Sequence, residues 1–182
     1  MYFESQSIEE IILIKPEIFN DQRGYIYEIY QKNKFSQNDI DINIVQQNQS
    51  RSKKGVLRGL HYQIQNPQGK LVRVISGEIF DVAVDLRKSS PTFGKWVGLR
   101  LDSESKSILW VPPGFAHGFL ALSEWAEIMY STTDLYSPKF ERTLIWNDPE
   151  IGIQWPLSDD LVPVLSPKDL LGKNLNEAEV YD

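Results

Sequence analysis

The stretch EIFDVAVDLR, residues 78–87, alternates apolar and charged side chains and indicates the type of fold. One parity carries the apolar residues Phe80, Val82, Val84 and Leu86, and the other carries Asp81, Asp85 and Arg87. A period of two residues is typical of a β-strand with two different faces. Residues 71–75 (LVRVI) form an apolar run just before it, and Ser76-Gly77 between the two runs predicts a hairpin turn.

Strand-like segments continue along the chain, whereas helical periodicity is hard to find. Further segments rich in β-branched or aromatic residues, bounded by Gly, Pro, Asn or Asp, are residues 25–30, 44–48, 96–101, 108–111, 127–133 and 143–146. Many short strands separated by turn signals predict an all-β sandwich or barrel. No repeat or interdomain linker is visible in the sequence, so we expect residues 1–182 to form a single domain with a core over about residues 11–157. We expect a short helix and irregular segments in residues 158–182.

Composition limits the classes of protein to consider. The 182 residues are 41% hydrophobic and 24% charged, as is ordinary for a soluble globular protein. No apolar run approaches the roughly 18 residues of a membrane span, and MYFESQSIEEIILIK does not resemble a signal peptide, so we expect a cytoplasmic protein that does not enter a membrane. The absence of cysteine excludes disulfides and thiolate chemistry. A net charge of -6 argues against a general nucleic-acid binder.

Cations gather between residues 46 and 73 although the whole chain is acidic. The polar side chains of this segment include Gln46, Gln47, Asn48, Arg51, Lys53, Lys54, Arg58, His61, Gln63, Lys70 and Arg73. One interpretation is a solvated edge strand and loop in which lysines prevent aggregation. The other is a pocket for an anionic ligand, with arginine as a two-pronged donor and lysine as a point charge. In a strand, His61 would share a face with Gly59 and Gln63, which adds a small preference for the pocket.

The sequence contains two histidines, His61 in RGLHYQ (58–63) and His117 in PPGFAHGF (112–119). They are far apart in the sequence and no His-x-His pair is present, so we expect no metal site. Nucleophile-elbow, P-loop and Rossmann glycine motifs are also absent. Acid–base chemistry by His61, with a tyrosine or carboxylate partner, remains. We expect His117 in a turn, where a structural role is at least as good an interpretation as a ligand contact.

Three other side chains allow both a structural and a functional interpretation. Tyr130, in EIMYSTTDLY, can be interpreted either as a residue that packs in a half-buried sheet or as one that acts on a ligand. Arg23, in DQRG, is solvated in an ordinary turn or binds a ligand. Glu28 interrupts the aromatic run YIYEIY, and a carboxylate in such a strand requires a partner.

Several long motifs follow one another from about residue 11 to residue 170. They are DQRGYIYEIY (21–30), NQSRSKKGVLRGLHYQ (48–63), QGKLVRVISGEIFDVAVDLRKSSPTFGKW (68–96), VPPGFAHGFLALS (111–123), YSTTDLYSP (130–138), WNDPEIGIQWP (146–156) and LSPKD (165–169). In this order and at this spacing, they resemble the dTDP-4-dehydrorhamnose 3,5-epimerase family.

The resemblance implies a cupin-like antiparallel β jelly roll with a few short helices, without a metal or a cofactor. It implies a homodimer in which the partner's N-terminal region helps to close the nucleotide site. The family converts dTDP-4-dehydro-6-deoxy-D-glucose into dTDP-4-dehydro-L-rhamnose on the route to dTDP-L-rhamnose. By motif, His61 corresponds to the general base, Tyr130 to the proton donor and Asp169 to the residue that orients His61. The tail of residues 158–182 then contributes to the site.

The resemblance also implies substrate contacts by Arg23, Glu28, Gln46, Gln47, Asn48, Arg58, Lys70, His117, Glu141 and Lys168. Gln47 departs from the aspartate of many relatives. Epimerisation beside a ketone requires a base and an acid on opposite faces of the carbon, and imidazole with a pKa of about 6.5 and phenol near 10 suit these roles. Lys70, with Arg58 nearby in sequence, is our candidate to stabilise the enolate. Arg23 and Lys168 are candidates for the diphosphate, and Gln46 and Asn48 for the base.

Other functions are compatible with the same pocket. Within enzymes they are a relative that inverts only C3 or C5 and a ketoisomerase acting on a similar nucleotide sugar. From another class, a cupin that binds a sugar nucleotide without catalysis would keep the pocket. The joint presence of His61, Tyr130 and Asp169 argues against the last of these, because binding alone requires neither a base nor an acid.

Overall fold

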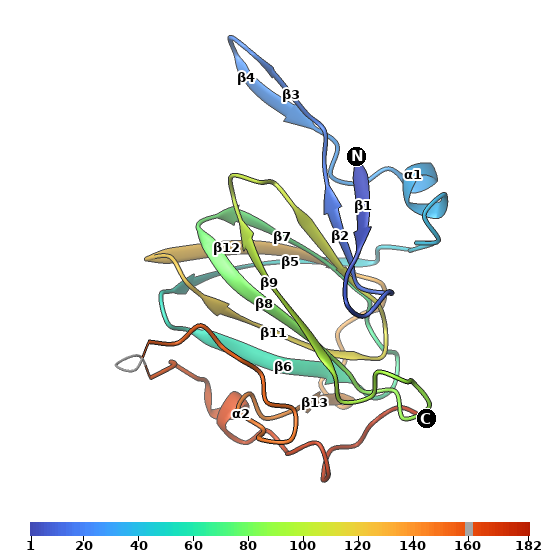
Figure 1. Cartoon of the computed structure of the whole chain (residues 1–182), viewed down its shortest axis with the longest axis vertical. Helices are drawn as coiled ribbons and strands as arrows, with labels where there is room; N and C mark the ends of the chain where they lie inside the picture. Colours follow the sequence, from blue (N-terminus) through green and yellow to red (C-terminus); the bar gives the residue numbers. More distant parts are fainter. Residues whose placement is uncertain (159–161) are drawn as a thin grey trace.

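Two antiparallel β-sheets pack face to face to form the body of the protein (Figure 1). The computed structural model describes residues 1–158 and 162–182. The six-stranded sheet has the order β1 (Tyr2–Ser5), β2 (Ile12–Lys15), β10 (Ile108–Val111), β7 (Lys70–Ser76), β12 (Trp125–Thr132) and β5 (Gln46–Lys53). The five-stranded sheet has the order β13 (Glu141–Thr143), β6 (Leu57–Gln63), β11 (Phe115–Ala121), β8 (Glu78–Asp85) and β9 (Trp96–Asp102). The predicted all-β architecture is confirmed.

Apolar side chains pack both between the two sheets and on the outer face of the five-stranded sheet. The main core fills the space between the sheets and includes Val72, Ile79 and Ile128. A second cluster lies on the five-stranded sheet and includes Leu144 and Leu175 from the C-terminal part of the chain. Full burial of such a side chain contributes about 1.5 to 3 kcal/mol. The C-terminal segment is therefore held on the sheet by apolar packing although it forms little regular structure.

Strand β8 alternates as predicted, but neither of its faces lies in water. Phe80, Val82 and Val84 belong to the cluster that the C-terminal segment covers. The opposite parity points between the sheets and contains Asp81 and Asp85, both with 0% exposure. Because a buried carboxylate is costly without a partner, each of these aspartates requires hydrogen-bond donors.

Several predicted strands are confirmed, and others lie a few residues from their predicted positions. Strands β9, β10 and β12 match the predicted segments 96–101, 108–111 and 127–133 closely. Strand β4 (Gly24–Tyr27) ends before residue 30, and β5 begins at Gln46. The predicted strand 143–146 is wrong, because regular pairing ends at Thr143 and Leu144 makes only an isolated bridge with Lys173.

The hairpin predicted at Ser76-Gly77 is wrong. Strand β7 pairs with β10 and β12, whereas β8 pairs with β11 and β9 in the other sheet. Gly77 has φ +82°, and a Cβ there would lie 2.2 Å from the carbonyl oxygen of Trp125. This glycine therefore allows the chain to cross between sheets at a crowded point. The dipeptide correctly indicated a change of direction, but it carried no information about the pairing partner.

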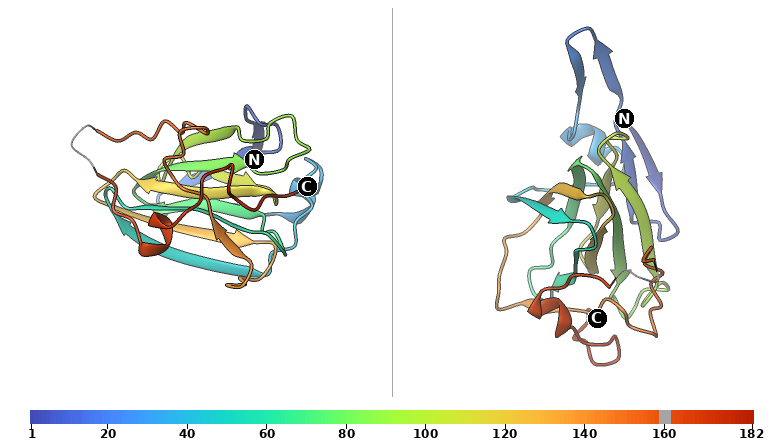
Figure 2. Two further views of the ribbon diagram at one scale, coloured as in Figure 1. Left: turned by 90° about the horizontal axis from the view of Figure 1, so that it is seen from below. Right: turned by 90° about the vertical axis from the view of Figure 1, so that its left-hand side faces the viewer.

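Two segments leave the two-sheet body. Strands β3 (Ile18–Asp21) and β4 form a hairpin that projects beyond the six-stranded sheet, near helix α1 (Lys32–Ser36) (Figure 1). At the other end, the C-terminal segment with helix α2 (Pro167–Leu170) runs along the five-stranded sheet (Figure 2). The predicted short helix and irregular tail are confirmed for the described residues. None of the helices in the described ranges has the length and apolar character needed to span a membrane.

Candidate active site

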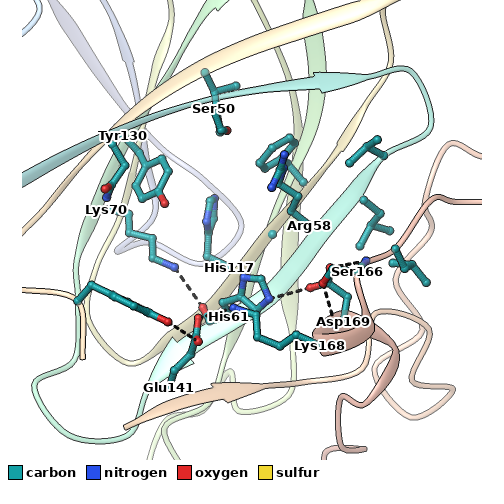
Figure 3. Close-up of a pocket in the computed structure, with 18 of the residues that line it drawn as sticks. Ser50, Arg58, His61, Lys70, His117, Tyr130, Glu141, Ser166, Lys168 and Asp169 are labelled. Atoms are coloured by element: carbon teal, nitrogen blue, oxygen red, sulfur yellow. Dashed lines mark hydrogen bonds and ion pairs between the residues drawn. The ribbon is translucent and has the colours of Figure 1, made fainter. Parts of the chain in front are cut away.

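A cavity of about 580 Å³ opens between the two sheets and is closed on one side by the C-terminal segment (Figure 3). Its walls come from β5, β6, β7, β11, β12 and the residues around α2. Ten of the sequence-predicted site residues line it: Gln46, Asn48, Arg58, His61, Lys70, His117, Tyr130, Glu141, Lys168 and Asp169. The structure thus brings most of the predicted site together from segments distant in sequence.

His61 and Asp169 form a hydrogen-bonded pair at the wall of the cavity. The Nε2 atom of His61 lies 2.7 Å from Oδ1 of Asp169, and the side-chain exposure is 25% for His61 and 3% for Asp169. A carboxylate next to Nε2 favours the tautomer with its proton on Nε2. The Nδ1 atom of His61 is then the basic nitrogen.

The local sequence around Asp169 explains why this carboxylate is held so firmly. Ser166 caps α2, and its Oγ donates to Asp169 Oδ2 at 2.6 Å while the Asp169 N–H donates back to Oγ. The backbone N–H groups of Ser166 and Gly59 also donate to the carboxylate, at 3.1 and 3.2 Å. Burial raises the pKa of Asp169, but the hydrogen bonds from His61, Ser166 and Gly59 outweigh burial and hold the pKa below its usual 3.8. Asp169 is therefore ionised at neutral pH.

His61 is kept in its neutral form. Burial lowers the pKa of His61 from its ordinary 6.5, and the cations Lys168 and Lys70 lower it further, while Asp169 opposes them. A neutral imidazole at pH 7 can accept a proton at once, as a general base must.

Lys70 places a cation beside His61. Its Nζ donates to the backbone carbonyl of His61 at 3.1 Å, and the residue is only 8% exposed. Burial lowers the pKa of Lys70 from 10.5 to about 8, against the opposing charges of Asp81 and Glu141. Most Lys70 side chains therefore still carry a proton at pH 7. Because the site is shielded from bulk water, this positive charge interacts strongly with groups close to it.

Tyr130 lies on the wall opposite His61. It belongs to β12 of the six-stranded sheet, where it pairs with Val72, whereas His61 belongs to β6 of the five-stranded sheet. Burial raises the pKa of Tyr130 above its ordinary 10, so the hydroxyl keeps its proton at neutral pH. The cavity therefore has a proton acceptor on one side and a proton donor on the other (Figure 3).

A register shift in β6 and β11 brings Arg58 and His61 into the same cavity. Regular alternation would place them on opposite faces, but His117 pairs with His61 while Phe119 pairs with Arg58. Two glycines make the shift possible, because a Cβ on Gly118 would lie 2.5 Å from the Arg58 carbonyl oxygen and one on Gly59 would lie 2.6 Å from the Gly118 Cα. Strand parity alone could not have predicted this arrangement.

Polar side chains form the rim of the cavity near β5 and β13. Glu141 accepts from Lys168 Nζ at 2.6 Å and from the Tyr136 hydroxyl at 2.9 Å. Gln46 donates to Asn48 at 3.0 Å and accepts from the Tyr136 backbone N–H. These residues offer amide groups and a cation to a polar ligand that extends out of the cavity.

The turn predicted around His117 is wrong. His117 lies in the middle of β11, is 7% exposed, and pairs across the sheet with His61. Its Nε2 lies 2.8 and 3.0 Å from the two carboxylate oxygens of Asp81, not next to a backbone group. The Pro-Pro-Gly sequence marks the turn before the strand, and the buried strand that follows contains too few polar residues to alternate visibly.

Sequence reasoning missed other residues of the site. Asp81 was assigned only to the polar parity of its strand, and Tyr136, Ser50 and Ser166 were not identified at all. The signal for Asp81 was present, since a carboxylate within the apolar sequence EIFDVAVD requires a partner as much as Glu28 does. Ser50 shares the parity of Gln46 and Asn48 in β5 and lines the same cavity.

Three of the predicted substrate contacts do not line this cavity. Gln47 faces the other side of β5 and donates to Ser131 Oγ at 3.0 Å. Arg23 lies at the tip of the β3–β4 hairpin, 86% exposed, where it pairs with Asp21. Glu28 follows β4 and pairs with Lys34, which is the partner that its aromatic surroundings called for.

The described part of the chain, residues 1–158 and 162–182, holds no group of three or more His, Asp or Glu side chains that could bind a metal ion. The cross-strand pairing of His61 with His117 nevertheless corrects one argument made from the sequence. Their distance along the chain does not separate them in space.

Comparison with known proteins agrees with the resemblance noted in the sequence. A family model described as dTDP-4-dehydrorhamnose 3,5-epimerase matches residues 5–177. The enzyme of that name from Pseudomonas aeruginosa is 53% identical over 176 residues, which cover 96% of each chain. The one from Methanothermobacter thermautotrophicus is 50% identical over 181 residues, covering 98% of this chain and 97% of the relative.

Solved structures match over the same length. The epimerase of Legionella pneumophila, in complex with dTDP-4-keto-L-rhamnose, is 48% identical with a TM-score of 0.94, and the match covers 98% of this chain and 94% of that one. A 3'-monoepimerase from Streptomyces bikiniensis in complex with dTDP-quinovose is 34% identical with a TM-score of 0.88, over 94% and 87% of the two chains. The predicted cupin-like jelly roll is confirmed, and the chain belongs to the dTDP-4-dehydrorhamnose 3,5-epimerase family.

Proposed function

We propose that the protein is an isomerase that inverts C3 and C5 of dTDP-4-dehydro-6-deoxy-D-glucose to give dTDP-4-dehydro-L-rhamnose. The observation that carries this proposal is the His61–Asp169 pair on one wall of the cavity and Tyr130 on the opposite wall. Inversion of a carbon needs a proton removed from one face and another delivered to the other face. The two carbons flank the C4 ketone, so the same groups can serve both in turn.

In the first step, Nδ1 of neutral His61 takes the proton from the carbon beside the ketone. The C–H electron pair forms a carbon–carbon double bond, and the carbonyl electrons move onto oxygen to give an enolate. Asp169, ionised and hydrogen-bonded to Nε2, stabilises the imidazolium that forms. Lys70, with a pKa of about 8, supplies a positive charge for the enolate oxygen.

In the second step, the Tyr130 hydroxyl delivers its proton to the opposite face of the carbon. The enolate electrons return to the carbonyl group and the new C–H bond has the inverted configuration. Solvent then restores the proton of Tyr130 and accepts the proton held by His61. The proposal assigns no step to a metal or a cofactor, and full activity after exhaustive chelation is the expected result.

The nucleotide part of the substrate lies along the polar rim in this proposal. Arg58 and Lys168 bind the diphosphate by charge-assisted hydrogen bonds, and Gln46 and Asn48 bind the base. His117 and Glu141 contact the sugar, and Lys168 exchanges its ion pair with Glu141 for the ligand.

Arg23 and Glu28 take part in the site of a second copy, whereas Gln47 faces away from the cavity and holds Ser131. The supporting observation is the β3–β4 hairpin, which projects from the two-sheet body (Figure 2). Its side chains Phe19, Tyr25 and Ile26 are exposed. Exposed aromatic and aliphatic side chains on a projecting hairpin favour contact with another protein surface. A homodimer in the cytoplasm, where nucleotide sugars are made, is the assembly that we propose.

Deuterium incorporation tests the reaction directly. The purified protein is incubated with dTDP-4-dehydro-6-deoxy-D-glucose in D₂O, and deuterons in the sugar are counted by mass spectrometry. We expect two deuterons, one at each inverted carbon. A single deuteron would support the monoepimerase alternative, which the Streptomyces bikiniensis neighbour makes worth testing. No incorporation would contradict an epimerase and leave a binder or another substrate.

Two variants identify the groups that carry the protons. His61→Asn should abolish incorporation at both carbons, since no base remains. Tyr130→Phe should permit exchange but impair formation of the inverted product, because the hydroxyl on the opposite wall is lost. Unchanged rate and stereochemistry in either variant would remove that residue from the mechanism.

A further inference from the structure

Asp81 is a buried carboxylate in contact with His117, which lines the cavity, and it has no role in the steps described above. It lies in β8 on the parity that faces between the sheets, and it has 0% exposure. Among the described residues, its two carboxylate oxygens accept from one side-chain group, Nε2 of His117, at 2.8 and 3.0 Å. A fully buried carboxylate is costly, so it is retained only where its charge is compensated.

The contact with Asp81 fixes which nitrogen of His117 faces the ligand. A carboxylate only accepts, so Nε2 carries a proton and donates it. Within residues 1–158 and 162–182, the only buried side-chain nitrogen or oxygen without a hydrogen-bond partner is Arg73 Nε. The Nδ1 atom of His117 has no protein hydrogen bond there, so it is not among the buried atoms and faces the cavity that the residue lines.

Asp81 also lies near Lys70. Lys70 Nζ donates to the backbone carbonyl of His61 at 3.1 Å, His61 pairs across the sheet with His117, and His117 contacts Asp81. The charges that act on the Lys70 ammonium come from Asp81 on β8, Glu141 on β13 and Lys168 in α2, and that of Asp81 raises the pKa of Lys70 against burial. Glu141 already pairs with Lys168, whereas the carboxylate of Asp81 has no other cation as a partner among the described residues. Asp81 is therefore a buried counter-charge near the lysine.

We propose that Asp81 is a positioning residue: its carboxylate holds His117 with Nδ1 toward the sugar and places a negative charge near Lys70, where the enolate oxygen forms. Asp81 touches neither the substrate nor the reacting atoms, and it acts through these two neighbours. The proposal rests on the proposed epimerase reaction for its kinetic test, whereas its second test observes the His117 ring directly and needs no turnover.

The kinetic test compares Asp81→Asn with Asp85→Asn over pH 6 to 10. Asp85 is a matched control, because it lies on the same strand and parity with 0% exposure but is paired with Arg87 at 2.8 Å. In Asp81→Asn, the alkaline limb of kcat should move below its wild-type position near pH 8, because Lys70 loses a counter-charge. A shift of one unit would lower kcat on the alkaline side by about tenfold. In Asp85→Asn, the limb should stay in place even if the protein is less stable.

An unchanged alkaline limb in a folded Asp81→Asn protein would overturn the proposal, as would an equal shift in Asp85→Asn. If the wild-type protein has no epimerase activity, the proposed function is wrong. The second test alone then decides whether Asp81 positions His117.

The second test measures the wild-type protein and does not depend on activity. The chain has only two histidines, so ¹⁵N labelling of histidine gives two ring systems, and a folded His61→Asn protein identifies the one that belongs to His117. We expect the His117 Nε2 to carry a proton at pH 7 and the Nδ1 resonance to shift when dTDP-sugar is added. A His117 ring with its proton on Nδ1 only would contradict the inference.

Discussion

At the scale of single residues, the site depends on how one carboxylate directs one imidazole. Asp169 is held by three donors besides His61, so its position does not depend on the substrate. The role of Asp169 in orienting His61 was implied by the LSPKD motif, and the physical reason becomes visible only in the capping box of α2. The residue pattern of the C-terminal segment gives no sign that Asp169 is buried.

Replacement of Asp169 by asparagine should disable the base without removing it. An amide can donate to His61 Nε2 and thereby favour the tautomer with its proton on Nδ1, which then cannot accept one. Loss of general base catalysis lowers rates by about 10²- to 10⁴-fold, and we expect kcat to fall within this range. Steady-state kinetics at pH 7.5 measure the effect.

Asp148→Asn is the matched control for that substitution. Asp148 is also buried, and it accepts from the backbone N–H of Leu175 in the C-terminal segment at 2.6 Å. It lies outside the cavity lining, so its loss should cost stability and leave kcat close to wild type. Equal losses of kcat in both variants would mean that Asp169 acts only by anchoring the segment.

The pH dependence of kcat should reflect His61 and Lys70. Activity requires neutral His61 and protonated Lys70 in the proposed mechanism. Burial lowers the pKa of His61 below its ordinary 6.5, so the acidic limb should lie below pH 6.5. Burial lowers the pKa of Lys70 to about 8, so activity should fall as the pH rises through about 8. A profile of kcat from pH 5 to 9.5 measures both limbs, and a flat profile through pH 8 would contradict the role of Lys70.

Between about pH 8 and 10, where activity should fall, the contribution of Lys70 to the stability of the fold should rise. Between pH 8 and 10 the unfolded chain binds a proton at Lys70 that the folded protein does not, because the pKa of Lys70 is 10.5 when unshifted and about 8 in the fold. The contribution of Lys70 to the free energy of unfolding therefore rises with pH in this window. Chemical denaturation of wild type and Lys70→Met at pH 8 and pH 10 isolates this contribution. Loss of activity there is then not a sign of unfolding.

At the scale of secondary-structure elements, the cavity depends on the close crossing of β6 and β11. Gly118→Ala would place a methyl group 2.5 Å from the Arg58 carbonyl oxygen and 3.0 Å from the Gly59 Cα, so the strands must separate. Crowding of this kind costs about 1 to 3 kcal/mol. It would also move His61 relative to Asp169, so we expect kcat to fall much more than the stability loss alone explains. Thermal denaturation and kcat should be measured on the same preparation.

Gly98→Ala provides the comparison for Gly118→Ala. Gly98 lies in β9 of the same sheet, and a Cβ there would lie 2.4 Å from the Phe80 ring and 2.7 Å from the Trp96 ring. It is equally crowded but is not part of the cavity lining. We expect a loss of stability with kcat preserved. If Gly98→Ala reduces kcat as much as Gly118→Ala, the crossing has no special effect on the site.

Elements rich in β-branched or aromatic residues were predictable, and elements that depend on distant partners were not. Strands β9 and β10 follow directly from their β-branched and aromatic residues. Strand β11 was missed because its sequence FAHGFLA has no β-branched residue and follows a Pro-Pro-Gly turn signal. The Ser76-Gly77 turn was assigned to a hairpin because local sequence does not record which sheet receives the next strand.

At the scale of the whole molecule, the projecting hairpin predicts that each site needs residues of two chains. We propose to co-express Arg23→Ala and His61→Asn chains with different tags and to isolate the hybrid dimer. If Arg23 acts in the partner's cavity, the hybrid has one complete site, because an intact His61 meets an intact hairpin. The isolated hybrid should then have about half of the wild-type number of active sites, because one of its two sites is complete. Active-site titration or kcat of the isolated hybrid measures the recovery.

Failure of the hybrid to regain activity would contradict the contribution in trans. The control is a mixture of the two variants purified separately and kept below the concentration at which subunits exchange. The proposed dimer contact could not be derived from the sequence by periodicity, because the exposed Phe19, Tyr25 and Ile26 occur among ordinary strand residues. It entered only through the resemblance to a family.

The pair formed by His61 and Asp169 has a consequence for the order in which the protein becomes active. The two residues are separated by 108 positions, and Asp169 follows every strand of both sheets in the sequence. During synthesis, both sheets can pair before the segment that carries Asp169 has left the ribosome. In the proposed mechanism, the nascent protein then holds His61 without the carboxylate that directs it. A chain interrupted before Asp169 is made should therefore lack activity even where both sheets have paired.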